Sequence, residues 1–107
     1  MDLTDQQRSA VAELCHRFGV QKLDVFGSAA NGKFDPAHSD IDFLVEFSAE
    51  HQGGLFHRYF GLLETLEQLF GRKIDLVSAT ALSNPYFMAS VNRSRQTVYA
   101  FARSLAA

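Results

Sequence analysis

The chain of 107 residues has a mass of 11.9 kDa, which is enough for one domain with one hydrophobic core. Hydrophobic residues make up 47% and charged residues 21%, which excludes a largely disordered chain, and the net charge of −2 argues against a general nucleic-acid binder. Cys15 is the single cysteine, so an internal disulfide is excluded. We expect a cytoplasmic protein, because no apolar run could span a membrane and the acidic N-terminus is unlike a signal peptide.

Hydrophobic periodicity and turn residues predict an alternation of helices and strands. Thr4 and Gln7 fit a capping box, and Asn84-Pro85 is typical of a helix start. Runs of β-branched and aromatic residues next to glycines predict strands. In chain order we predict a helix at 5–18, a strand at 20–26, a short helix at 28–32, a strand at 41–47, a helix at 55–70, a strand at 74–77, a helix at about 84–94 and a strand at 97–101.

This order predicts an α+β fold in which a small mixed sheet of about four strands has helices packed on one face. No repeat or linker divides residues 1–107, so we predict a single domain. The apolar face of the helix at 55–70 is broader than one core contact requires, and the chain after Asp75 contains three arginines and no carboxylate. Both are candidate docking surfaces; the alternatives are a helix buried on two sides and a solvated basic tail.

Two carboxylates stand at the start of the second predicted strand. Asp40 and Asp42 are two residues apart, so their side chains point to the same side of the strand. Such neighbours repel each other unless a cation such as Mg²⁺ lies between them. Asp75 lies in the next predicted strand, and if the two strands pair, three carboxylates can hold two Mg²⁺ ions for a displacement at phosphorus. Taken singly, each carboxylate also suits an ordinary solvent-facing strand position.

A glycine and a serine follow the first predicted strand. Gly27 permits a sharp turn, and Ser28 then opens a short helix whose N-terminus can bind phosphate. The alternative is a serine that only caps the helix. Residues 27–33 also match the first seven positions of a P-loop, but Phe34 lacks the hydroxyl that binds Mg²⁺, and Asp35-Pro36 leaves no room for the long helix.

These residues together resemble a known family. Gly27-Ser28, followed after eleven residues by Asp40-Ile41-Asp42-Phe43, resembles the signature of the DNA polymerase β-like nucleotidyltransferases. The tighter pattern Ser39-Asp40-Ile41-Asp42-x-x-Val45 is similar to that of the minimal nucleotidyltransferases. The resemblance covers nearly the whole chain, continuing through residues 71–77, 84–86 and 98–99, and it implies a polymerase β-like nucleotidyltransferase core.

The resemblance implies an enzyme that transfers a nucleoside monophosphate from a triphosphate onto a hydroxyl. Asp40 and Asp42 would ligate two Mg²⁺ ions, and Asp75 would ligate the catalytic ion and help to deprotonate the acceptor. Gly27, Ser28 and Lys33 would bind the nucleotide. Many minimal members are antitoxins of HEPN-type ribonuclease toxins, and some place AMP on a toxin tyrosine. We therefore expect Mg²⁺-dependent transfer of AMP from ATP to a tyrosine of a partner HEPN toxin.

One departure from the family concerns positive charge, because Ala29 and Asn31 stand where the family often has arginine. Three carboxylates, a triphosphate of about −4 and two Mg²⁺ ions leave about −3 unbalanced, so a cation is required. The candidate cations are Lys33, Arg72, Lys73, Arg93 and Arg95, and His38 is a candidate contact to phosphate or acceptor. Two alternatives stay open: a non-catalytic antitoxin that masks its partner by stoichiometric binding, and a transferase that modifies a small molecule.

Overall fold

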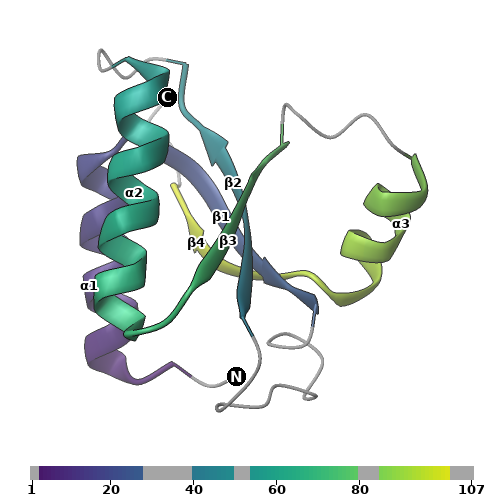
Figure 1. The fold of residues 1–107 in the computed structure, drawn as a ribbon, viewed down its shortest axis with the longest axis horizontal. Coiled ribbons are helices and arrows are strands. Elements are labelled where there is room, and N and C mark those ends of the chain that lie inside the picture. Colours follow the sequence, from purple (N-terminus) through teal and green to yellow (C-terminus); the bar gives the residue numbers. More distant parts are fainter. Residues whose placement is uncertain (1–2, 28–39, 50–53, 80–84, 102–107) are drawn as a thin grey trace, which may run out of the picture.

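The computed structural model describes residues 3–27, 40–49, 54–79 and 85–101. Its elements agree with the predicted ones to within one residue at each end, and the predicted short helix at 28–32 lies outside the described residues. In chain order they are α1 (Asp5–Arg17), β1 (Val20–Phe26), β2 (Ile41–Phe47), α2 (Leu55–Phe70), β3 (Ile74–Ser78), α3 (Pro85–Ser94) and β4 (Gln96–Ala100) (Figure 1).

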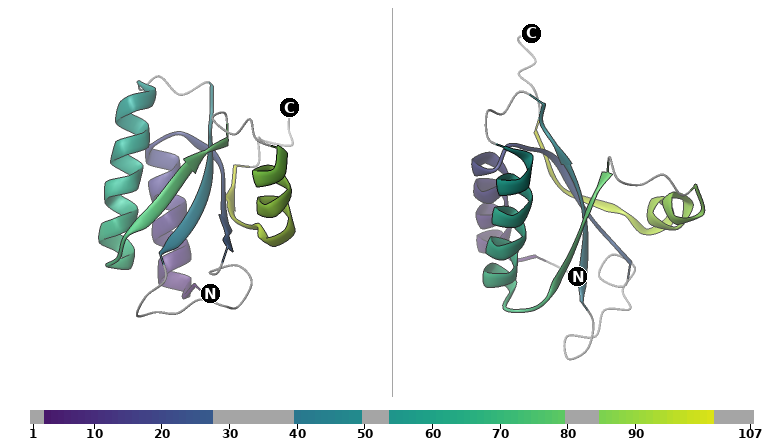
Figure 2. Two further views of the ribbon diagram at one scale, coloured as in Figure 1. Left: turned by 45° about the vertical axis from the view of Figure 1, so that its right-hand side comes forward. Right: turned by 45° about the horizontal axis from the view of Figure 1, so that its top comes forward.

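The four strands form one mixed sheet in the order β3-β2-β1-β4. β1 pairs antiparallel with β2 and β4, whereas β2 and β3 are parallel. Helices α1 and α2 lie side by side over one face, and α3 lies on the opposite side of the sheet (Figure 2). The predicted α+β fold with a small mixed sheet is thus confirmed, and α3 is an addition on the second face.

Local sequence explains the helix ends. Thr4 and Gln7 form both bonds of the predicted capping box, which satisfies two free amides at the start of α1. Gly71 ends α2 in the left-handed conformation, with φ of 65°, which a residue with a Cβ adopts at a cost. None of the helices in the described ranges is both long and apolar enough to cross a membrane.

The main core lies between the sheet and the helices α1 and α2. It is built from alternate strand residues that point to one face, together with the inner faces of the two helices. Its members are Val11, Leu14, Cys15, Val20, Leu23, Val25, Ile41, Phe43, Val45, Leu62, Leu66, Ile74 and Leu76. Burial raises the pKa of the Cys15 thiol to about 12, so this cysteine is a core residue and not a reactive one.

The opposite face of the sheet carries a smaller apolar cluster beneath α3. Phe26, Leu44 and Val91 form it. Phe26 is the register partner of Asp42, and Asp42 is the register partner of Asp75, so these residues share this second face. Carboxylates on this side of the sheet therefore avoid the main core.

Part of the broad apolar face predicted for α2 is exposed. Leu55, Phe56 and Phe60 are 57%, 70% and 49% exposed, and the rings of Phe56 and Phe60 pack with their centroids 4.6 Å apart. Docking at this surface stays a prediction. Of the three arginines after Asp75, Arg93 and Arg95 are described and Arg103 lies outside the described residues.

Candidate active site

Three segments that are distant in the sequence meet at one edge of the sheet. β2 and β3 are parallel and begin at this edge, with Asp42 in register with Asp75. β1 is antiparallel to β2 and ends there, with Phe26 opposite Asp42 and Gly27 next along the chain. Asp40 immediately precedes β2. The strand pairing on which the sequence prediction depended is therefore present, and Asp42 and Asp75 lie on the same face.

Gly27 lies directly against the Asp42 carboxylate. Its φ is +69°, in the left-handed region that favours glycine. A Cβ at this position would lie 2.6 Å from Asp42 Oδ2. The backbone amide of Gly27 donates a hydrogen bond to Ser94 Oγ at 3.0 Å. Glycine is therefore required here both for the turn and for the close approach to the carboxylate.

The three carboxylates act on one another electrostatically. Partial burial raises the pKa of Asp42, and the negative charges of Asp75 and Asp40 together with a hydrogen bond to Asp75 raise it further. Asp40 and Asp75 are themselves exposed. Asp42 is thus the carboxylate that is affected by both of the others, and a cation bound beside it would relieve the repulsion.

The carboxylates have the oxygen ligands that a divalent cation requires, but their side chains are not arranged as a complete metal site. Oxygen ligands from carboxylates are those that Mg²⁺ takes in proteins. Within the described segments, however, no three Asp, Glu, His or Cys side chains are close enough to form a complete ligand set. Asp40, Asp42 and Asp75 are the described residues at this end of the sheet that could contribute such oxygen ligands.

A first prediction concerns pH and stability without metal. Because the pKa of Asp42 is raised in the folded state, the folded protein binds this proton more tightly than the unfolded chain does. The resulting stabilisation is fully present below the unfolded pKa of about 3.9 and is lost as the pH rises through the folded value. In EDTA, the free energy of unfolding of the wild type minus that of Asp42→Asn should therefore fall as the pH rises above about 4. Urea titrations at several pH values measure it, and a difference that rises with pH would contradict this electrostatic account.

A second prediction concerns Gly27→Ala. The added methyl group would displace the Asp42 carboxylate, so transfer activity should fall at least about 10²-fold. The positive φ should also cost about 1–2 kcal/mol of stability. Gly71→Ala is the matched control, because Gly71 has a similar φ of +65° but nothing within 4 Å of the added Cβ. The control should lose similar stability and keep its activity; equal activity losses in the two variants would contradict the close-contact argument.

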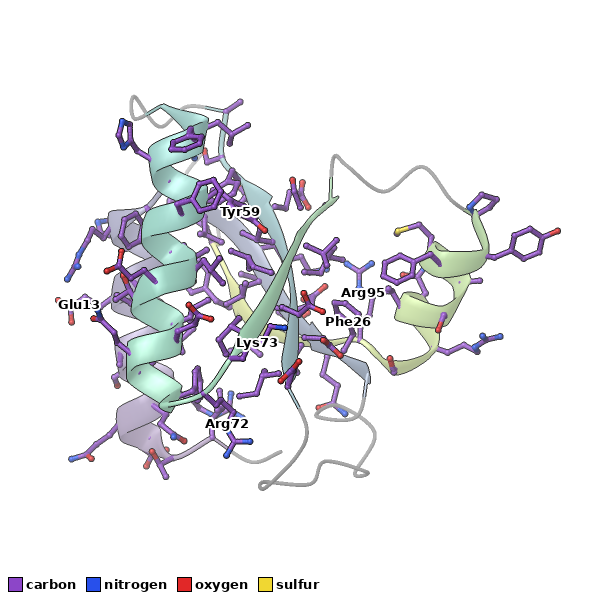
Figure 3. All side chains as sticks on the ribbon, in the orientation of Figure 1. Glu13, Phe26, Tyr59, Arg72, Lys73 and Arg95 are labelled. Atoms are coloured by element: carbon purple, nitrogen blue, oxygen red, sulfur yellow. The ribbon has the colours of Figure 1, made fainter. Side chains whose placement is uncertain are left out.

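The structure separates the candidate cations. Lys73 Nζ lies 4.0 Å from Asp40 Oδ2, at the site itself. Arg95 instead pairs with the buried Asp24, at 2.7 Å from Nη2 to Oδ2. Figure 3 shows Lys73 at the sheet and Arg95 between the sheet and α3. Arg93 is exposed and Arg72 half-buried. Lys73 is therefore a cation that lies beside one of the three carboxylates, Asp40.

Several predicted site residues lie outside the described residues. These are Ser28 and Lys33, predicted to bind the nucleotide, together with Ala29, Asn31 and His38. Their roles stay predictions.

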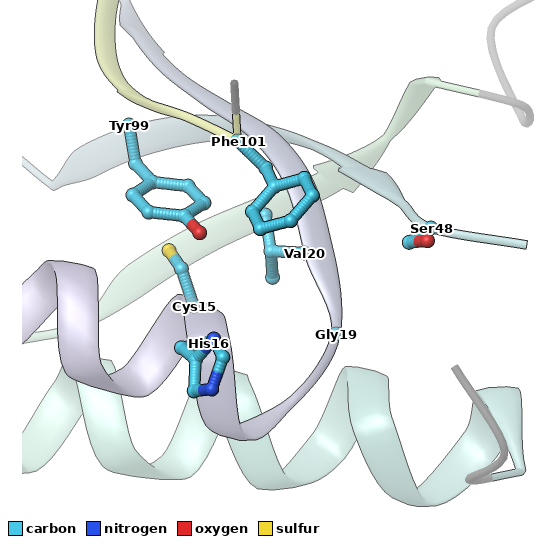
Figure 4. A pocket seen from close by; sticks show the side chains of 7 residues that line it. All are labelled: Cys15, His16, Gly19, Val20, Ser48, Tyr99 and Phe101. Carbon is cyan, nitrogen blue, oxygen red and sulfur yellow. The ribbon is translucent and has the colours of Figure 1, made fainter. Parts of the chain in front are cut away.

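The described residues line two hollows. One, of about 200 Å³, is lined by Cys15, His16, Gly19, Val20, Ser48, Tyr99 and Phe101 (Figure 4). The other, of about 210 Å³, lies on the α3 side and is lined by Lys22, Asp24, Leu44, Glu46, Ala79, Met88 and Arg95. Neither lining includes Asp40, Asp42 or Asp75.

Sequence reasoning missed Ser94 and Asp24. Asp24 is a carboxylate inside the strand Leu23-Asp24-Val25, and it is 1% exposed. An acidic residue amid apolar strand residues does signal a buried partner. Its partner, Arg95, is 71 residues away, and no local pattern identifies it.

Comparison with known proteins identifies the family. The family profile described as nucleotidyltransferase domain matches residues 8–99. The chain is 40% identical over 72 residues to protein adenylyltransferase MntA of Thermococcus cleftensis, covering 67% of this chain and 69% of that protein.

Solved structures agree with this result. A structure assigned as a minimal nucleotidyltransferase matches with a TM-score of 0.69 and 35% identity, over 85% of this chain and 88% of that chain. A complex of tri-AMPylated Shewanella oneidensis HEPN toxin with MNT antitoxin shares the fold, with a TM-score of 0.62 at 16% identity, over 92% of this chain and 74% of that chain. The chain therefore belongs to the nucleotidyltransferase domain family, as an enzyme of the minimal nucleotidyltransferase type.

Proposed function

We propose that this enzyme transfers AMP from ATP to a tyrosine hydroxyl of a HEPN-type toxin and thereby acts as its antitoxin. The observation that carries the proposal is the parallel register of Asp42 with Asp75, beside Gly27. The relative named protein adenylyltransferase MntA supports the reaction class. The fold shared with the antitoxin of an AMPylated HEPN toxin complex supports the kind of partner.

The proposed chemistry is an in-line displacement at the α-phosphorus of ATP. The tyrosine oxygen forms a bond to this phosphorus, the bond to the bridging oxygen of the β-phosphate breaks, and pyrophosphate leaves with the electron pair. Divalent cations held by Asp40, Asp42 and Asp75 would neutralise the phosphate charge. Asp75, which is exposed, would accept the tyrosine proton and pass it to water.

Phosphate binding in this proposal is divided among groups near Gly27. The Gly27 amide already donates to Ser94, so Gly27 contributes its turn and its missing side chain. Ser28 and Lys33 would supply the hydroxyl and the positive charge, and Lys73 beside Asp40 would add a second charge.

The experiment combines the protein with the product of the neighbouring gene as candidate partner, ATP labelled on the α-phosphate and Mg²⁺. We expect label and the mass of AMP on a tyrosine of the partner, and none when EDTA is added. Label from GTP, CTP or UTP at equal efficiency would contradict the choice of ATP. A partner that gains no label under any of these conditions would contradict the proposal.

The same assay distinguishes the two alternatives. A stoichiometric antitoxin would protect cells from the partner equally well as wild type and as Asp42→Asn. A small-molecule transferase would consume ATP with a hydroxylated small acceptor when no partner protein is present. The relative named protein adenylyltransferase MntA favours a protein acceptor.

A further inference from the structure

A buried ion pair joins β1 to the junction of α3 and β4. Arg95, the residue between these two elements, donates from Nε to Asp24 Oδ2 at 2.8 Å, and its Nη2 lies 2.7 Å from the same oxygen. Lys22 Nζ is 3.7 Å from this oxygen, while Asp24 Oδ1 is buried and has no hydrogen-bond partner among the described residues. The guanidinium also donates from Nη1 to Asn92 Oδ1, at 2.8 Å.

This ion pair fixes where α3 ends relative to the sheet. A carboxylate that is 1% exposed is strongly unfavourable unless it is paired, so separating Asp24 from Arg95 is costly. Asp24 lies in β1, and Arg95 directly precedes β4, which is the hydrogen-bonded neighbour of β1. The residue before Arg95 is therefore held in a defined place.

That preceding residue is Ser94, and it contacts the candidate active site. Its Oγ accepts the hydrogen bond from the Gly27 amide at 3.0 Å, across 67 residues of sequence. Gly27 in turn lies against Asp42, where even a methyl group would come within 2.6 Å of the carboxylate. A continuous set of contacts thus runs from Asp24 through Arg95, Ser94 and Gly27 to Asp42.

We propose that Ser94, anchored by the Asp24–Arg95 ion pair, is a positioning residue that holds the Gly27 turn against the Asp42 carboxylate. Ser94 acts through Gly27 and does not touch the reacting atoms. The test by AMP transfer rests on the proposed function. The Mn²⁺-binding measurement described below does not require that the protein transfers AMP.

The test compares Ser94→Ala with Ser90→Ala, an exposed serine on the same helix. Loss of the Ser94 hydroxyl should lower kcat for AMP transfer about 10- to 100-fold, because small misplacements at a reacting centre cost this much. The KM for ATP should change less than about threefold, because the substitution removes no interaction that binds substrate and transition state equally. Ser94→Thr, which keeps the hydroxyl, should restore most of the rate. If Ser94→Ala keeps kcat within twofold of Ser90→Ala, the proposal is wrong.

Two further arms separate positioning from stability and from failure of the proposed function. Arg95→Lys, which keeps the charge but loses the planar fork, should lower kcat relative to Ser90→Ala. Assays run well below the melting temperature of every variant exclude unfolding as the cause. If the wild type transfers no AMP, the proposed function fails and Mn²⁺ titration decides this inference: Ser94→Ala should bind Mn²⁺ at least threefold more weakly than Ser90→Ala, and equal affinities would overturn it.

Discussion

Asp42→Asn should lower AMP transfer by at least about 10³-fold while the protein stays folded. Asparagine keeps the shape of the side chain but removes the charge that a divalent cation requires. The fold should survive, because the burial of Asp42 and its repulsion by Asp75 and Asp40 raise its pKa and make its charge unfavourable in the absence of metal. The rate of label transfer from ATP to the partner and the melting temperature measure the two effects.

The matched control is Glu46→Gln, an exposed acid on the same strand β2. It removes one negative charge from the same element and should leave the transfer rate unchanged. If the two variants lose the same activity, the effect belongs to overall charge and not to the site. Full activity in Asp42→Asn would remove this residue from the mechanism.

Arg58→Ala should give the largest loss of stability, about 3–5 kcal/mol in the free energy of unfolding. Arg58 is a 6% exposed residue of α2, and its guanidinium donates to the carbonyls of Phe18 at 2.9 Å, Gly19 at 2.6 Å and Ser48 at 2.8 Å. It also lies over the ring of Phe47, 5.0 Å from its centroid. Alanine would remove this donor from all three carbonyls, of which that of Gly19 still accepts from the Ser48 amide, and create a cavity where α1, β2 and α2 meet. Chemical denaturation measures the loss.

Two variants test whether the hydrogen bonds of Arg58 carry this stability. Arg58→Lys keeps a positive charge but cannot reach three carbonyls with a planar fork, so it should lose most of the same free energy. Arg8→Ala removes an exposed arginine from α1 and should change stability by no more than about 0.5 kcal/mol. Wild-type stability in Arg58→Lys would show that the charge or the packing of this side chain, and not the hydrogen bonds of its planar guanidinium, carries the stability.

The sequence predicts the order and bounds of the elements well, for local reasons. The capping box at Thr4, the stop at Gly71 and the strand patterns each depend on residues that are neighbours along the chain. The pairing of Asp42 with Asp75 can also be predicted from the sequence, because a helix between two strands of one sheet favours a parallel crossover.

What the sequence does not predict depends on distant contacts. Arg58 looks like a surface arginine of an amphipathic helix, and its buried position follows from carbonyls on two other segments. The ion pair of Asp24 with Arg95 and the bond from Gly27 to Ser94 each join residues more than 60 positions apart. The position of α3 on the second face of the sheet depends on these contacts, so it could not be read from the periodicity of α3 alone.

The most direct test is a crystal structure of the protein with Mn²⁺ and a non-hydrolysable ATP analogue, with the ions located by anomalous scattering. The account predicts divalent ions ligated by Asp40, Asp42 and Asp75, with the triphosphate beside the Gly27 turn. Manganese bound elsewhere, or a nucleotide held on the α1–α2 side of the sheet, would contradict it.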